Sequence, residues 1–240
     1  MSDLQGMKLD VLAFSAHPDD IELAAAGTII KLGKKGYAVG VADMTRGELG
    51  TRGSKEIRQK EAEEAAALMQ LKVRECLDIP DGSVTVTREN HLKVIKLLRK
   101  YQPRVVINHY WKARHADHMA TSQIVTEACY LSGLAKIETG QQRWRPKRII
   151  YHQLHYDVTP SFLVDISDVI EQKWKVVRAH KSQFYDPESK EPETLLSAPS
   201  FLEMINTKMK YWGELIGGTH AEIFLTTEPF AIPDVVEALG

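Results

Sequence analysis

The sequence has few cysteines: only Cys76 and Cys129 occur in 240 residues. They lie far apart and are flanked by apolar residues, so we expect two reduced thiols in the core rather than a disulfide framework. The chain also lacks any apolar stretch that approaches the length of a membrane-spanning helix. Its first residues, Met1 to Leu4, do not combine a basic segment with an apolar one, as a secretion signal would. These absences predict a cytoplasmic protein.

An excess of one charge is absent too. The 31 lysines and arginines nearly balance the 32 aspartates and glutamates, which leaves a net charge of −1 when the histidines are neutral. Such a chain creates no overall field that would draw it to nucleic acid or to a membrane surface, so we expect neither as a partner. No internal repeat, linker or low-complexity tract divides the sequence, and 43% of its residues are hydrophobic. We therefore predict one domain over residues 1–240 with one large core.

Stretches typical of strands alternate with stretches typical of helices along the chain. This alternation predicts an α/β fold with a mostly parallel sheet and helices on both faces. The last third is less regular: residues 184–199 indicate an exposed loop, and apolar residues at helical spacing predict a final helix with a buried stripe. The predicted strands span residues 8–14, 37–43, 73–77, 104–108, 148–152 and 162–166, the predicted helices span 21–35, 54–69, 88–100, 117–132 and 169–180, and the stripe consists of Leu202, Ile205, Met209, Trp212 and Ile216.

Two short polar segments follow predicted buried strands. The first runs from His17 to Glu22 and holds one histidine and three carboxylates directly after the apolar run 9–14. The second runs from Arg114 to His118 and follows the apolar run 105–108. The turn from a strand into a helix is a usual place for a site in an open α/β sheet. The two segments can meet only if their strands are neighbours in one parallel sheet.

Together the two segments could bind one divalent metal ion. His17 and Asp20, three residues apart, could chelate it from one side, and His118 could complete the site from the other. Two imidazoles, one carboxylate and an open position for water make a common catalytic zinc site. Asp19 would then remain as a general base, and His115 would face the substrate.

Other interpretations of the same residues stay open. Asp19 and Glu22 could form a capping box at the start of a helix, and Asp117 could cap the helix that begins beside it. A nucleotide-dependent Rossmann enzyme would show the same alternation of strands and helices. Its first strand-to-helix turn, however, would carry G-x-G-x-x-G, whereas this turn carries carboxylates that are unsuited to a pyrophosphate. A non-catalytic protein that binds metal or sugar is a third interpretation.

The wording of both segments resembles one known family. The first resembles the AHPDD(E) signature of the PIG-L/LmbE-like deacetylases, and the second resembles the family's His-Pro-Asp-His motif, with Ala116 in place of proline. The resemblance covers about residues 7–225. The Asp-Asp-Ile-Glu-Leu variant, with Ile21 where many members have glutamate, looks most similar to the subgroup that deacetylates N-acetylglucosaminyl-malate in bacillithiol biosynthesis. The residues that carry the resemblance are His17-Pro18-Asp19-Asp20, Glu22, Ala26-Gly27-Thr28 and His115-Ala116-Asp117-His118.

The resemblance implies a Rossmann-like, zinc-dependent N-deacetylase that acts on a small N-acetyl sugar conjugate. Fe²⁺ and Co²⁺ would also suit the ligand set. Related proteins often assemble, so a homo-oligomer is an open expectation. By position, the metal ligands are His17, Asp20 and His118, the general base is Asp19, and the oxyanion is stabilised by His115 with Asp117 as its orienting partner.

Substrate contacts are expected near the glycine-rich loop 45–54, which follows the second predicted strand. Arginine side chains could present paired donors to the carboxylates of a malate group. We predict Arg58 and Arg114 as the main contacts and Arg46 as a further one. Asp81, in the turn Pro80-Asp81-Gly82, corresponds to a place where the family binds sugar hydroxyls. A deacetylase of another N-acyl sugar remains an alternative.

Overall fold

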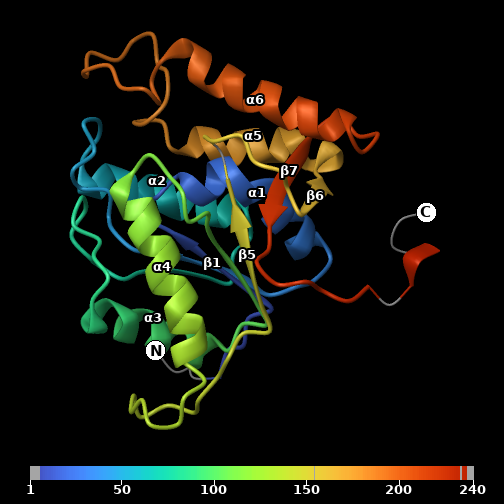
Figure 1. Cartoon of the computed structure of the whole chain (residues 1–240). Coiled ribbons are helices and arrows are strands. Elements are labelled where there is room, and N and C mark those ends of the chain that lie inside the picture. The colour runs from blue at the N-terminus through green and yellow to red at the C-terminus, as the bar shows by residue number, and fades with distance from the viewer. Residues whose placement is uncertain (1–5, 154, 233, 237–240) are drawn as a thin grey trace.

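A computed structural model describes residues 6–153, 155–232 and 234–236, and a seven-stranded sheet runs through its centre (Figure 1). The strands lie in the order β3-β2-β1-β4-β5-β7-β6. The first five strands pair in parallel, whereas β7 is antiparallel to both β5 and β6. The predicted mostly parallel sheet is therefore confirmed. The strands are β1 Val11–Ser15, β2 Val39–Asp43, β3 Val73–Cys76, β4 Val105–His109, β5 Arg148–His152, β6 Phe162–Asp165 and β7 Ala221–Leu225.

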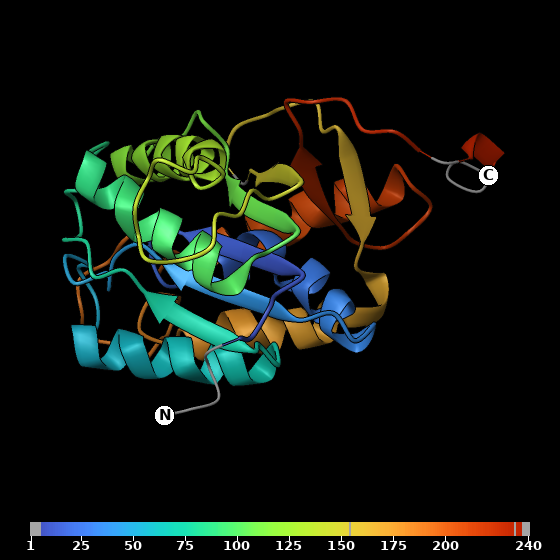
Figure 2. The same cartoon turned by 90° about the horizontal axis from the view of Figure 1, so that it is seen from below.

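Helices cover both faces of the sheet (Figure 2). Alternate residues of β1 point to opposite faces: Val11 and Ala13 join one hydrophobic core, and Leu12 and Phe14 join the other. The first core is closed by α1, α2, α5 and α6, and the second by α3 and α4. The helices are α1 Asp20–Lys34, α2 Lys55–Leu68, α3 Arg88–Tyr101, α4 Ala116–Leu131, the short 3₁₀ helix η1 Ser167–Val169, α5 Ile170–Ala179 and α6 Pro199–Glu214.

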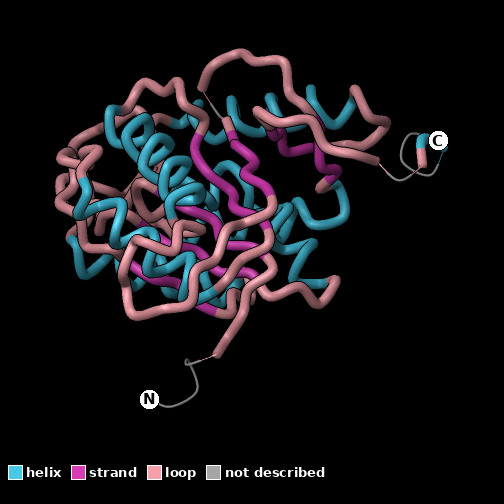
Figure 3. The backbone as a smooth tube through the Cα atoms, turned by 60° about the horizontal axis from the view of Figure 1, so that its bottom comes forward, coloured by secondary structure: helices cyan, strands magenta, loops and turns pink. Residues whose placement is uncertain are grey.

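Strand β7 is an element that the sequence pattern did not predict. All five of its residues are buried, including Glu222 in its second position. The charge is tolerated there because Nζ of the buried Lys173 lies 2.6 Å from Glu222 Oε1. A strand with a glutamate inside it does not show the apolar pattern of a buried strand. After β7 the chain leaves the sheet and runs outward (Figure 3).

Two expectations about the core need correction. Ile205 and Met209 of the predicted stripe are buried, but Ile216 lies beyond the end of α6 and is 45% exposed. Cys129 is buried as predicted, whereas Cys76, the last residue of β3, is exposed. Within the described residues, no helix combines the length and the apolar character that a membrane crossing requires.

The topology brings the two polar segments together. β1 and β4 are neighbours in the sheet, with Ala13 paired with Ile107. Both strands are parallel, so the loops that follow them emerge at the same edge. His17 lies in the loop after β1, and His118 lies in the first turn of α4, which follows β4. Neighbouring strands thus bridge a separation of about a hundred residues, as the sequence analysis required.

Candidate metal and catalytic site

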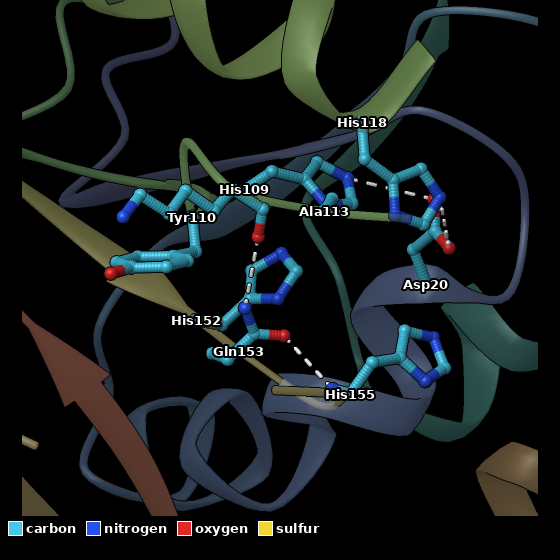
Figure 4. Close-up of a pocket in the computed structure, with 9 residues that line it drawn as sticks. Asp20, His109, Tyr110, Ala113, His118, His152, Gln153 and His155 are labelled. Carbon is cyan, nitrogen blue, oxygen red and sulfur yellow. Dashed lines mark hydrogen bonds and ion pairs between the residues drawn. The ribbon is translucent and has the colours of Figure 1, made fainter. Parts of the chain in front are cut away.

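The carboxylate of Asp20 lies between two imidazoles. Its Oδ1 is 3.2 Å from Nε2 of His118, and its Oδ2 is 3.5 Å from Nδ1 of His17. In Figure 4, Asp20 at the start of α1 faces His118 of α4. Burial alone would raise the pKa of Asp20, but the neighbouring histidines outweigh it and hold the pKa well below its usual value. Asp20 therefore contacts both of the other predicted metal ligands, and its carboxylate stays ionised.

His17 is surrounded by carboxylates on its other side. Its Nε2 lies 3.0 Å from Asp81 Oδ1 and 3.3 Å from Asp117 Oδ2. Burial would lower the pKa of His17, but Asp117, Asp20 and Asp81 together raise it well above the usual value. The carboxylates around His17 thus favour positive charge at this point. The ring nitrogens of His17, His115 and His118 also lie within 4.8 Å of one another. Three imidazole nitrogens at this spacing fit a divalent ion such as Zn²⁺.

Asp19 occupies the turn between these ligands. It is 4% exposed, and its backbone has φ 132°, a region that residues with a side chain rarely adopt. Its carboxylate makes no capping hydrogen bond to α1, so the capping-box interpretation is wrong. Arg58 Nη2 instead donates a hydrogen bond of 3.1 Å to Asp19 Oδ2. Burial raises the pKa of Asp19 to about 6, and the charge of Arg58 opposes that shift. A carboxyl with such a pKa can exchange a proton near neutral pH.

The predicted pairing of His115 with the Asp117 carboxylate is wrong. Nδ1 of His115 accepts a hydrogen bond of 3.2 Å from the backbone N–H of Asp117, so His115 itself caps α4. The Asp117 carboxylate turns away, toward His17 and toward the backbone N–H groups of Gly82 (2.8 Å) and Val84 (3.3 Å). Backbone N–H groups of the loop after β3, and not the His115 ring, therefore bind the Asp117 carboxylate. Asp117 therefore positions His17 and the loop after β3.

The comparisons with known proteins agree with this geometry. The family model for PIG-L, described as GlcNAc-PI de-N-acetylase, matches residues 12–129. The chain is also 30% identical to diacetylchitobiose deacetylase of Thermococcus kodakarensis, over 92% of this chain and 86% of the relative. The chain belongs to the PIG-L family.

Two further proteins are similar to this chain over most of its length. A probable N-acetyl-alpha-D-glucosaminyl L-malate deacetylase 2 of Bacillus anthracis is 26% identical, over 72% of this chain and 81% of the relative. The crystal structure of the conserved protein TT1542 from Thermus thermophilus superposes with a TM-score of 0.86 at 35% identity, over 94% of this chain and 98% of that one. The family resemblance and the predicted fold are confirmed, and the relatives include the expected malate deacetylases at a greater distance.

In this PIG-L protein, a cleft of about 330 Å³ is lined by the three predicted metal ligands and by Asp19. Three of the four predicted substrate residues line it: Asp81, Arg58 and Arg114. Arg114 is exposed, whereas Arg58 is 4% exposed and engaged with backbone and Asp19. The fourth, Arg46, lies outside the cleft, where its guanidinium pairs with Asp78 at the surface. The sequence could not show this pairing because it depends on how two loops pack.

Further residues outside the predicted set lie beside Asp20 or line the cleft. Nε2 of His109, the last residue of β4, accepts a hydrogen bond of 3.0 Å from the backbone N–H of Ala16 and lies 3.5 Å from Asp20 Oδ2. His155, in the chain after β5, lines both the cleft and the adjoining pocket drawn in Figure 4. Thr194 and Leu196, from the loop that was expected to be exposed, also line the cleft. His109 could have been found from the sequence, because it ends a strand shortly before the second motif. Nothing in the sequence of the loop pointed to Thr194 or Leu196.

Proposed function

We propose that this protein is a metal-dependent hydrolase that removes the acetyl group from an N-acetylglucosamine-containing sugar. One observation carries the proposal: the Asp20 carboxylate lies between His17 and His118, with the buried carboxyl of Asp19 next to it in the same cleft. A ligand set and a neighbouring base are the two parts that hydrolysis of an unactivated amide needs. The named activities of the relatives support the same reaction.

His17, Asp20 and His118 would hold the metal, for which Zn²⁺ is the best match and Fe²⁺ or Co²⁺ would also fit. When bound, the ion would polarise the amide carbonyl and lower the pKa of water at its open position. Asp19 takes one proton from the attacking water as the oxygen of that water adds to the acetyl carbon. The C–N bond then breaks, and Asp19 returns the proton to the departing amine. The products are acetate and the free amino sugar.

His115 stabilises the oxyanion as a neutral donor. Burial lowers the pKa of His115, and the nearby His17 and His118 lower it further, so the neutral ring is favoured. Because Nδ1 accepts the Asp117 N–H, the ring proton of the neutral form lies on Nε2. This N–H can donate to the developing oxyanion. The lowered pKa of His115 and the turned carboxylate argue against an imidazolium held by Asp117.

For the substrate, we propose a chitobiose-like N-acetylglucosamine disaccharide, with N-acetylglucosaminyl-malate of bacillithiol biosynthesis as a second candidate. The malate conjugate would need cationic donors for its two carboxylates. Arg114 is exposed in the cleft and could donate a pair of hydrogen bonds to one of these carboxylates, which favours the malate conjugate. However, Arg46 lies outside the cleft, and both Nη atoms of Arg58 already donate hydrogen bonds. A neutral disaccharide requires no such donors.

The test is release of free amine from three substrates by zinc-loaded protein: diacetylchitobiose, N-acetylglucosaminyl-malate and N-acetylglucosamine. A chelator-treated sample serves as the metal-free control. Metal-dependent release that favours the disaccharide supports the first candidate, and release that favours the malate conjugate supports the second. Metal-independent release, or none from any substrate with zinc bound, would refute the proposed reaction.

A further inference from the structure

Arg58 connects the first motif to the glycine-rich loop. It lies on α2, and its guanidinium is buried. Nη1 donates to the carbonyl oxygen of Gly47 at 2.7 Å, and Nη2 donates to the carbonyl oxygen of Pro18 at 2.8 Å and to Asp19 Oδ2 at 3.1 Å. The three acceptors belong to two loops on the same side of the cleft. Arg58 therefore fixes the position of one loop relative to the other.

The conformation of Asp19 needs such support. Its φ of 132° is unfavourable for a residue with a side chain, and α1 gives its carboxylate no capping hydrogen bond. Backbone conformations of this kind persist only where surrounding contacts hold them. Arg58 supplies two such contacts, one to the carbonyl oxygen of the Pro18–Asp19 peptide and one to the Asp19 carboxylate.

The glycine-rich loop is shaped to receive this arginine. Gly47 has φ +67°, and a Cβ there would lie 2.0 Å from Arg58 Nη1, so no other residue fits while the arginine is in place. Thr45 holds the loop against the first motif, because its hydroxyl donates to the carbonyl oxygen of Ala16 at 2.9 Å and accepts the N–H of Gly47 at 3.1 Å. The loop thus leaves room for the Arg58 guanidinium and accepts a hydrogen bond from it.

We infer that Arg58 is a positioning residue for Asp19 and not a binding site for substrate carboxylates. By engaging Oδ2 and the adjacent carbonyl, it orients the carboxyl so that Oδ1 takes the proton. Both N–H groups of Nη2 and one of Nη1 already donate to protein acceptors, and Nε is buried, so Arg58 does not present a free, accessible pair of donors to a substrate carboxylate. This inference rests on the proposed function, in which Asp19 is the base.

The test compares Arg58→Gln and Arg58→Lys with Lys60→Gln, an exposed residue on the same helix, as matched control. Steady-state kinetics are measured on diacetylchitobiose and on N-acetylglucosaminyl-malate, together with zinc content and the melting temperature. For Arg58→Gln we expect kcat to fall roughly a hundredfold on whichever substrates the wild type cleaves, the scale of a small misplacement of a reacting group. KM should change less than about twofold, and zinc content should not change. Added guanidinium ion, far below denaturing concentrations, should restore part of the lost kcat, and Arg58→Lys should lose less than Arg58→Gln.

Two results would overturn the inference. An increase in KM confined to the malate conjugate would identify Arg58 as a substrate contact, and an unchanged kcat would show that Asp19 does not depend on it. Crystal structures of wild type and Arg58→Gln give a readout without activity: Asp19 should leave its positive φ when the guanidinium is removed. If the wild type cleaves no substrate, the proposed function fails, while these structures still decide whether Arg58 holds Asp19.

Discussion

Asp20 and His118 face each other across the end of the sheet, with 3.2 Å between Oδ1 of the carboxylate and Nε2 of the ring. Asp20 opens α1, which follows β1, and His118 lies in the first turn of α4, which follows β4. The contact exists because β1 and β4 pair in parallel and release their loops at one edge. The pairing of β1 with β4 therefore decides whether these two side chains meet.

The first prediction concerns the metal. Asp20→Asn keeps the size of the side chain but removes the charge between the two imidazoles, so Zn²⁺ affinity should fall at least tenfold, to roughly a hundredfold. Competition with a chromogenic chelator measures this directly. Asp168→Asn is the control, because Asp168 is an exposed carboxylate paired with Lys31 far from the cleft. Equal Zn²⁺ affinity in Asp20→Asn and the wild type would remove Asp20 from the ligand set.

The second prediction separates the base from the ligands. Asp19→Asn should bind zinc as the wild type does, because Asp19 is assigned no bond to the metal. Amine release should fall roughly a hundredfold or more, the usual scale for loss of a general base. Zinc content and turnover are measured on the same preparation. Full activity in this variant would mean that another group accepts the proton.

The two motifs could be located from sequence because their information is local. A strand followed by His-Pro-Asp-Asp or by His-Ala-Asp-His places its polar residues at the end of that strand wherever the strand lies. Alternation of strands and helices then made β1 and β4 plausible neighbours in a parallel sheet. The fold class and the meeting of His17, Asp20 and His118 followed from these facts.

The partners of side chains could not be predicted in the same way. Arg46 pairs with Asp78, and the Asp117 carboxylate accepts backbone N–H groups of the loop after β3. Both contacts depend on how loops fold onto one another, which no periodic pattern records. Strand β7 escaped prediction for a related reason, because Glu222 is neutralised by Lys173 from a distant helix.

A third prediction concerns stability at low pH. Burial lowers the pKa of His152 from 6.5 to about 3, so the folded protein keeps this ring neutral. Below pH 6.5 His152 binds a proton in the unfolded chain but not in the folded chain. The free energy of unfolding should therefore fall steadily until about pH 3. We expect His152→Gln to weaken the pH dependence of the free energy of unfolding by on the order of 2 kcal/mol between pH 6.5 and 4.5. The charged and titratable groups around the ring are Asp20, His109, His118, His155 and Lys173.

Urea denaturation at a series of pH values measures this effect, and the difference between wild type and His152→Gln isolates the one ring from the others. His91→Gln is the control, because His91 lies on α3 and pairs with Glu127 away from the cleft. If the free energy of unfolding depends on pH in the same way in both variants, the fold does not keep the His152 ring neutral.

The last prediction concerns the buried ion pair that supports β7. Lys173 Nζ donates to Glu222 Oε1 at 2.6 Å and to the carbonyl oxygen of Leu23 at 2.7 Å. Glu222 also accepts the N–H groups of Gly27 (2.8 Å) and Thr28 (2.7 Å), so the pair joins α5, α1 and β7. Lys173→Met would leave the glutamate buried without a counter-charge. It should lower the free energy of unfolding by about 3–5 kcal/mol, the usual cost of breaking a buried pair from one side.

Urea denaturation near neutral pH measures the loss. Lys181→Met is the matched control, because Lys181 and Glu64 lie 3.9 Å apart with side chains 75% and 53% exposed, and breaking such a pair costs less than about 1 kcal/mol. The double variant Lys173→Met with Glu222→Gln removes both charges and should recover part of the stability that the single variant loses. A loss below about 1 kcal/mol in Lys173→Met would show that Glu222 becomes protonated or reaches solvent, and that β7 does not depend on the lysine.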